Sequence, residues 1–378
     1  MKMITRLVCL ISAAAAVLPM QNAFAKEEGT VKKFTVDEAV EYMLENSLAV
    51  KADEESLKSY EMSRKAKILL RYRVNDTYAA YKVTAPGVDD MDTFLLTSGY
   101  VNYYNDAMVT IAKRTLSETK YQLTVKLENK YYSCLNADKK VKVALDALDN
   151  ALENKQHADM KKEQGVIGAI EAQSFELALI SAQNDYDDAV RSRDYMYCEL
   201  KQLMSYPDDK EIVLTGEFQR QPMDQTPLAQ ALDGLDKTAN KLNLDISLAL
   251  QNELTKTYKS MYTTSMYEYQ EQKYAYAKAE AEYNDNICNL RLALRDSYNT
   301  MVSTYGKLDY IDKAIDLKEQ QADAQKTSYE LGLSTASQYL TSVQELNELK
   351  LSRVDAEIGA YLTSRAYQIL YHESEIQN

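Results

Sequence analysis

Apolar residues between positions 168 and 204 recur at alternating intervals of four and three residues. The series is Phe175, Leu179, Ala182, Tyr186, Ala189, Met196, Leu200 and Leu203, interrupted only at Arg193. A repeat of 3.5 residues is typical of a helix that packs along its length on another helix, as in a coiled coil. The pattern therefore predicts a long helix with one buried stripe.

The second half of the chain carries a tyrosine stripe, in which Tyr262, Tyr269, Tyr276 and Tyr283 recur every seven residues. Such a stripe could line a ligand channel. We interpret it as a packing surface, because a tyrosine ring can be buried while its hydroxyl stays in water.

Residues 100–164 and 263–331 contain no proline, and their patterns predict two helices on the order of 100 Å long at about 1.5 Å per residue. Each is followed by a helical pattern of about half that length, over residues 168–204 and 335–371. Helices of this length must lie alongside one another. The predicted fold is all-α: elongated, antiparallel, coiled-coil helical hairpins.

A glycine ends each of the two longest patterns, Gly165 in the first and Gly332 in the second. A residue that tolerates positive φ ends a helix and satisfies its last carbonyls. The next helix starts three residues later. Thr335 with Gln338 matches a capping box, and Gly168 with Glu171 is a weaker version of it.

These two turns, which we call the tips, lie 167 residues apart, counted from Gly165 to Gly332. The similarity of the two tips indicates an internal duplication. The same offset, without gaps, pairs Glu163 with Glu330, Ala169 with Ala336, Ala189 with Ala356, Leu203 with Leu370 and Tyr131 with Tyr298. We therefore expect one helical repeat over residues 26–214 and a second over 215–378, joined by a polar linker from Glu217 to Thr226.

The start of each repeat carries helix signals. Thr35 and Glu38 form a capping-box pattern, and the helix pauses at Asn46-Ser47. In the second repeat, Thr226-Pro227 predicts a cap followed by proline at the first helical position, with a pause near Asn240 and Asn243. Residues 70–104 leave two alternatives open, a β-hairpin or two helices joined by a loop.

Residues 1–25 predict a secretory signal peptide. Lys2 and Arg6 precede an apolar run, and Ala23-Phe24-Ala25 forms the cleavage motif. The mature chain would be exported. No second apolar run reaches the roughly 18 residues that a transmembrane helix needs.

Composition narrows the function. A net charge of −13 disfavours nucleic acid as a partner. Ten glycines and five prolines in 378 residues favour few, long helices. Of the four cysteines, Cys9 lies in the predicted signal peptide, and the other three are Cys134, Cys198 and Cys288. Because an odd number remains, we interpret them as buried single thiols rather than disulfides.

The candidate chemistry is sparse. His157 and His372 are the only histidines, have no metal-ligand spacing around them, and are expected at the surface. The carboxylates Asp185, Asp187 and Asp188 are interpreted as a solvated helix face. We predict neither an enzyme nor a cofactor site.

An exported, duplicated, all-helical chain with the Thr35-x-x-Glu38-Ala39 start and the Asn46-Ser47 pause resembles the TolC-type outer-membrane efflux protein family. The most specific part is the second tip, YELGLST at residues 329–335, followed by Leu340, Leu346, Leu349 and Ala356. The resemblance covers the whole mature chain.

The resemblance implies a homotrimer in the periplasm and outer membrane whose helices form a tunnel, with four strands per chain in a shared barrel. Such conduits passively export small molecules or proteins in tripartite efflux or type I secretion. A periplasmic adaptor at the helical tips joins the tunnel to an inner-membrane transporter. The implied docking tips are Gly165, Gly168, Gly332, Leu333, Ser334 and Thr335, and the tunnel-mouth positions are Glu171, Ser174, Gln338 and Thr341.

Two features depart from the family. Strands of roughly 9–11 alternating residues are not evident, so we expect little or no β-barrel. Gln338 and Thr341 replace acidic residues that narrow the tunnel mouth in some members. The alternative function is a barrel-less coiled-coil scaffold of the cell envelope. Because the seams carry small and aromatic residues on more than one helix face, we expect a homotrimer.

Overall fold

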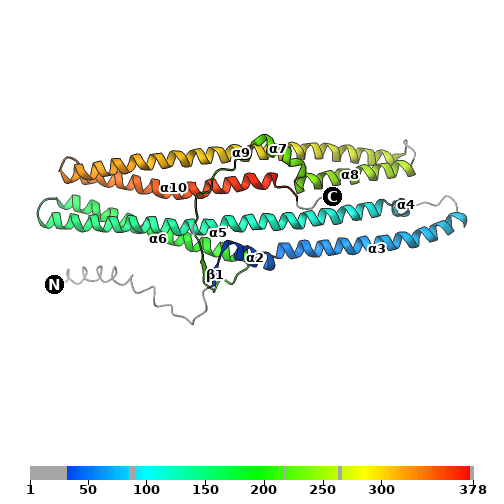
Figure 1. Ribbon diagram of the computed structural model, residues 1–378, viewed down its shortest axis with the longest axis horizontal. Coiled ribbons are helices and arrows are strands. Elements are labelled where there is room, and N and C mark those ends of the chain that lie inside the picture. The colour runs from blue at the N-terminus through cyan, green and yellow to red at the C-terminus, as the bar shows by residue number, and fades with distance from the viewer. Residues whose placement is uncertain (1–31, 85–90, 217, 263–265, 375–378) are drawn as a thin grey trace.

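The computed structural model describes residues 32–84, 91–216, 218–262 and 266–374. The predicted signal peptide lies outside these residues. In chain order the elements are β1 (Lys32–Phe34), α2 (Val36–Asn46), α3 (Leu48–Thr84), α4 (Met91–Ser98), α5 (Tyr100–Glu163), α6 (Ala169–Met204), β2 (Ile212–Leu214), α7 (Leu228–Gly234), a 3-10 turn (Leu235–Lys237), α8 (Ala239–Met261), α9 (Tyr267–Glu330) and α10 (Ala336–Tyr371). The elongated all-α fold is confirmed (Figure 1).

Two helical hairpins build the body. Helices α5 and α9 have 64 residues each, and the return helices α6 and α10 have 36 each. The bounds of α9 and α10 equal those of α5 and α6 shifted by 167 residues. Local signals therefore place the same turns in both halves of the chain.

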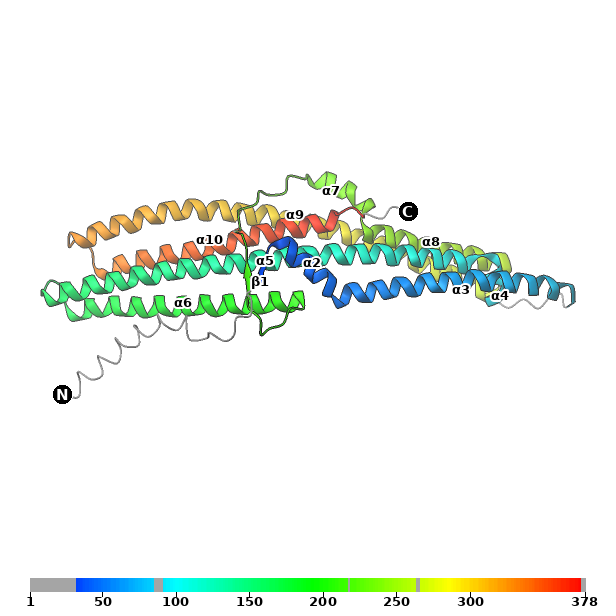
Figure 2. The same cartoon turned by 60° about the horizontal axis from the view of Figure 1, so that its bottom comes forward.

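The helices lie side by side in an open layer (Figures 1 and 2). In the tip half, which contains the turns at 164–168 and 331–335, α6 packs on α5, α5 on α10, and α10 on α9. In the opposite, far half, α3 packs on α5, α5 on α8, and α8 on α9. The edges of the layer are thus α6 and α3 on one side and α9 on the other.

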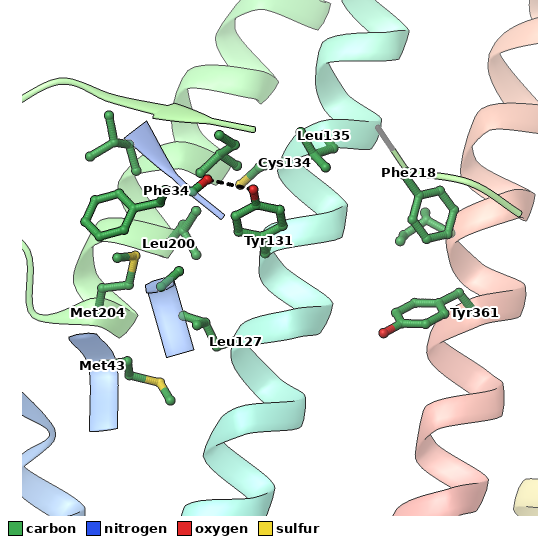
Figure 3. Close-up of a cluster of buried hydrophobic side chains, with 14 residues drawn as sticks. Phe34, Met43, Leu127, Tyr131, Cys134, Leu135, Leu200, Met204, Phe218 and Tyr361 are labelled. Carbon is green, nitrogen blue, oxygen red and sulfur yellow. Dashed lines mark hydrogen bonds between the residues drawn. The ribbon is translucent and has the colours of Figure 1, made fainter. Parts of the chain in front are cut away.

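The middle of the body holds a core that the sequence pattern did not predict. Strand β1 pairs in parallel with β2, with Phe34 opposite Leu214. The buried Tyr131 of α5 reaches both strands, because its hydroxyl lies 2.8 Å from the carbonyl oxygen of Phe34 and 2.7 Å from that of Thr215 (Figure 3). This contact fixes the strand pair on the long helix.

The linker between the repeats is held by tyrosine hydroxyls. Tyr305 donates to the carbonyl of Gln221 and Tyr367 to that of Thr226, while Tyr371 donates to Asp224 at 2.6 Å. The linker therefore lies on α9 and α10 as an ordered strap.

Several local predictions are confirmed. Thr35 and Glu38 form a capping box, and the chain pauses at Ser47 between α2 and α3. Residues 70–104 hold helices where they are described, so the two-helix alternative is correct. The strands that the family resemblance implies are not among the described residues, whose only strands are β1 and β2.

Other local predictions were wrong in part. Pro227 is the N-cap of α7 rather than its first helical residue. The predicted pause is present: a 3-10 turn ends at Lys237, and Thr238, two residues before Asn240, caps α8. Tyr262 ends α8, so only the other three members of the tyrosine stripe lie on α9, where they are half-buried as packing requires.

Candidate functional site: the helical tips

Both tips close with the same backbone geometry. Gly165 has φ of 71° and Gly332 has φ of 72°, as predicted. In the first tip the amide of Val166 donates to the carbonyl of Lys161 at 2.8 Å, and in the second Leu333 donates to Ser328 at 2.8 Å. These bonds satisfy the last helix carbonyls in a Schellman motif. A Cβ added to either glycine would meet no atom within 4 Å, so there is room for a side chain. Glycine is required at these positions because of the positive φ.

The starts of the return helices differ. Thr335 forms the predicted capping box: its hydroxyl accepts from the amide of Gln338 at 3.3 Å, and the Gln338 side chain accepts from the amide of Thr335 at 3.0 Å. Gly168 is the N-cap of α6, as expected, but α6 has no side-chain cap hydrogen bond. The second tip is therefore the better defined of the two.

A small core joins the two tips. Ala158 and Phe175 of the first hairpin are buried against Ala336 and Tyr339 of the second. The rings of Tyr329 and Tyr339 stack with centroids 5.8 Å apart. The tips are thus one rigid end of the body rather than two independent loops.

The outer surface of this end is apolar. Leu333 is 79% exposed, and a further set of large apolar side chains on the two tips is more than half exposed: Val166, Ile170, Leu177 and Leu331. Gly165, Gly168, Gly332 and Thr335 are also exposed, whereas Ser334 is half-buried. Exposed apolar clusters of this kind mark interaction surfaces.

The four predicted mouth positions have different surroundings. Ser174 of α6 and Thr341 of α10 line one groove of about 350 Å³ between the hairpins. Gln338 is taken up by the capping box. Glu171 lies near Tyr329, where burial raises the pKa of the phenol and the carboxylate raises it further.

The groove also contains two carboxylates, and one of them, Asp185, is exposed, as predicted for a solvated helix face. Asp185 and Glu348 lie on its wall among small residues. Partial burial, together with Asp188 and Glu348, raises the pKa of Asp185. Its place on the wall of a groove was not predicted, because helix periodicity alone does not distinguish a groove from an open face.

Other candidate residues occupy ordinary positions. Of the three described cysteines, Cys134 is buried and burial raises its pKa to about 12, but Cys198 and Cys288 are exposed, contrary to expectation. His157 is exposed, whereas His372 is half-buried and stacks on Tyr121 with centroids 3.5 Å apart. Within the described ranges there is no group of three or more metal-ligating side chains.

A search for helices long and apolar enough to cross a bilayer finds none in the described part of the chain. No protein-family model and no curated protein matches the sequence. Solved structures do match. The Vibrio cholerae outer membrane protein VceC has a TM-score of 0.72 at 12% identity, covering 90% of this chain and 96% of that one.

The chain has the fold of the TolC-type outer-membrane channels. The Campylobacter jejuni CmeC outer membrane channel matches with a TM-score of 0.70 at 11% identity, covering 90% of this chain and 87% of that one. The Neisseria gonorrhoeae MtrE channel, in its open state, matches at 0.60 and 13%, covering 91% of each chain. The TolC-like similarity therefore spans both repeats. At such identities it establishes the fold, whereas function rests on the surfaces described above.

Proposed function

We propose that the protein is an exported, trimeric, TolC-like conduit of the cell envelope, located in the periplasm and outer membrane, that passes small molecules or proteins passively in an efflux or type I secretion assembly. The observation that carries this proposal is the similarity of nine-tenths of the chain to outer membrane channels over nearly their full length. Two helical repeats, 26–214 and 215–378, would form the wall.

The open layer supports assembly into a closed wall. Its two edges, α3 with α6 and α9, do not pack on each other within one chain. Large apolar side chains are exposed along both edges, among them Leu48 on α3 and Tyr310 on α9. Because a layer with two different edges can close only by repeating around an axis, a cyclic homo-oligomer covers both.

The oligomer is testable on the chain lacking residues 1–25. We expect mass photometry to show three copies of the 353-residue chain (378 minus 25). Sedimentation at several concentrations should give the same stoichiometry. A stable monomer at micromolar concentration would contradict the conduit.

We further propose that the tips bind a periplasmic adaptor that connects to an inner-membrane transporter, through the exposed residues around Gly165, Gly168, Gly332, Leu333, Ser334 and Thr335. The apolar surface there and the rigid Schellman turns provide a preformed docking site. Glu171, Ser174, Gln338 and Thr341 would then lie at the mouth of the passage.

Substitutions at the second tip should separate binding from folding. Gly332→Val and Thr335→Ala should each cost about 1 kcal/mol, since one requires a strained φ and the other loses a cap. Circular dichroism should stay unchanged while capture of the adaptor weakens. Gly306→Ala in the middle of α9 is the matched control, because a Cβ there meets nothing within 4 Å. Unchanged capture by both tip variants would place the adaptor elsewhere.

The second candidate function is a structural scaffold of the envelope. It is favoured by one observation, that α4 and the first part of α5 are helical in the far half, so the described chain there resembles the rest of the coiled-coil body. Conductance across planar bilayers separates the two functions. Discrete channel openings support the conduit, and an assembled trimer without them supports the scaffold.

A further inference from the structure

The far half of the molecule exposes two helix stripes with coiled-coil spacing and no helix packed on them. The α3 seam consists of Leu48, Lys51, Glu55, Lys58, Met62, Lys65, Leu69 and Tyr72, and the α9 seam consists of Tyr267, Glu271, Tyr274, Lys278, Ala281, Asp285, Cys288 and Leu292; all are exposed. The spacing alternates between three and four residues throughout. Residues at this spacing lie along one face of a helix, which can pair with a second helix along its length.

The large apolar members of both seams face solvent in the single chain. On α3, Leu48 is 78% and Met62 is 71% exposed; on α9, Tyr267 is 74% and Tyr274 is 71% exposed. The seams lie on opposite edges of the layer, α3 on the far side of α5 and α9 on the far side of α8. One chain therefore cannot pair them with each other.

Contacts within the chain show which residues of different helices lie at the same position along the long axis of the body, which we call their height. Arg64 of α3 pairs with Asp106 of α5. Asp245 of α8 accepts a hydrogen bond from Tyr283 of α9 at 2.8 Å and interacts electrostatically with Arg114 of α5. Arg114 and Tyr283 thus lie at about the same height, to within the reach of these long side chains.

The same contacts show which residue of α9 lies at the height of Arg64. Asp106 precedes Arg114 by eight residues, and α5 and α9 run in the same direction, so Arg64 lies at the height of residue 275 (283 minus 8). Rotation about an axis parallel to the helices leaves heights unchanged. In the ring proposed above, the part of α3 around Arg64 in one copy must therefore lie beside the region of residue 275 in the next copy.

In an antiparallel register that agrees with this height, position 64 faces residue 272. Residue 272 is three residues from 275, which is less than one helical turn of about 5.4 Å. The facing residues are Leu48 with Cys288, Lys51 with Asp285, Glu55 with Ala281, Lys58 with Lys278, Met62 with Tyr274, Lys65 with Glu271, and Leu69 with Tyr267. Leu48, Met62 and Leu69 meet Cys288, Tyr274 and Tyr267, whereas Glu55 faces the small Ala281. Lys51 and Lys65, which form no ion pair with another described residue, meet carboxylates.

One facing pair has like charges, Lys58 and Lys278. Each already has a carboxylate beside it on its own helix: Glu55 lies 2.8 Å from Lys58, and Glu282 lies 3.7 Å from Lys278. The four side chains can form crossed pairs between the copies. The local repulsion is therefore neutralised within the contact.

We propose that the α3 seam of one copy docks on the α9 seam of the next copy in this register, with Lys51 against Asp285 and Lys65 against Glu271. This inference rests on the proposed ring. The partner is a second copy of this chain, since the match of charge, apolar residues and height is specific to it.

Charge reversal tests the pairing. Lys51→Glu with Lys65→Glu, or Glu271→Lys with Asp285→Lys, should each raise the concentration at which half the trimer dissociates by about tenfold or more, because two attractive pairs per contact become repulsive. Combining all four should restore assembly. Lys67→Glu with Lys259→Glu, two exposed lysines outside the seams, is the control with the same change in charge.

A cysteine cross-link gives a second, geometric test. Leu48→Cys should form a disulfide with the native Cys288 of the next copy under mild oxidation, giving linked dimers and trimers on a non-reducing gel. The links should vanish with Cys288→Ser. Ala49→Cys, at the same height on another face of α3, should give few links.

The outcomes separate this contact from the ring itself. A trimer without cross-links and without rescue by the fourfold variant overturns the pairing but leaves the ring standing. Absence of any trimer in the unmodified protein overturns both. If Lys51→Glu with Lys65→Glu leaves assembly intact but abolishes cosedimentation with phosphatidylglycerol vesicles, the α3 seam is a membrane contact and the pairing is wrong.

Discussion

Replacing Tyr131 with alanine is expected to lower the free energy of unfolding by about 4 kcal/mol, the range found for removal of a large buried ring. The side chain is 1% exposed at the centre of the core that joins α2, α5, α6 and the strands. Its hydroxyl also accepts from the amide of Thr215 at 3.0 Å. Urea unfolding followed by circular dichroism measures the change.

Smaller changes at this site distinguish packing from hydrogen bonding. Tyr131→Phe keeps the ring and should cost about 1–2 kcal/mol, because it leaves buried backbone groups with fewer partners. Tyr298→Phe, at the corresponding position of the second repeat, is the control: its ring packs on Tyr367, but its hydroxyl makes no hydrogen bond to another described group. Equal losses in the two phenylalanine variants would contradict the role of the Tyr131 hydroxyl.

Replacing Lys139 with methionine should destabilise the protein by about 3 kcal/mol, because it leaves a buried carboxylate poorly compensated. Glu357 is only 6% exposed, with Lys139 at 3.6 Å and Arg353 at 3.9 Å. Lys139 also donates to the carbonyl of Phe218 at 2.8 Å. Thermal and urea unfolding should both show the loss.

Lys140→Met is the control for this prediction. Lys140 is adjacent in sequence and pairs with Asp355, whose side chain is 61% exposed, so its loss should cost less than about 1 kcal/mol. Adding Glu357→Met to Lys139→Met should recover much of the stability, since removing both charges removes the desolvation cost. A Lys139→Met protein as stable as Lys140→Met would show that Glu357 is adequately solvated.

The hairpins could be predicted from sequence because their signals are local. Gly332 and the Thr335 to Gln338 capping box lie within seven residues of one another, and the seam of α6 repeats over 29 residues, from Phe175 to Leu203. The β1 and β2 pairing could not be predicted in the same way. Each strand has three residues, too few to show alternation, and Phe34 and Leu214 are 180 residues apart (214 minus 34).

The candidate site was predictable in part for the same reason. Turn glycines and caps are readable, and the structure places them as expected. The groove with Asp185 and Glu348 depends on how two hairpins approach each other, which periodicity does not specify. Cys288 is exposed although it was predicted to be buried, because a place in a helical pattern does not show which helix face a residue occupies.

The unequal lengths of the helices have a mechanical consequence. Among the described elements, α5 and α9 run from the tips into the far half without a break, whereas α2 ends, α3 begins, and α6 and α10 finish near the middle. A load applied at the tips is therefore carried to the other end by two stiff rods per chain. The shorter helices end near the middle of the body and do not stiffen it there, so bending should concentrate in this middle region.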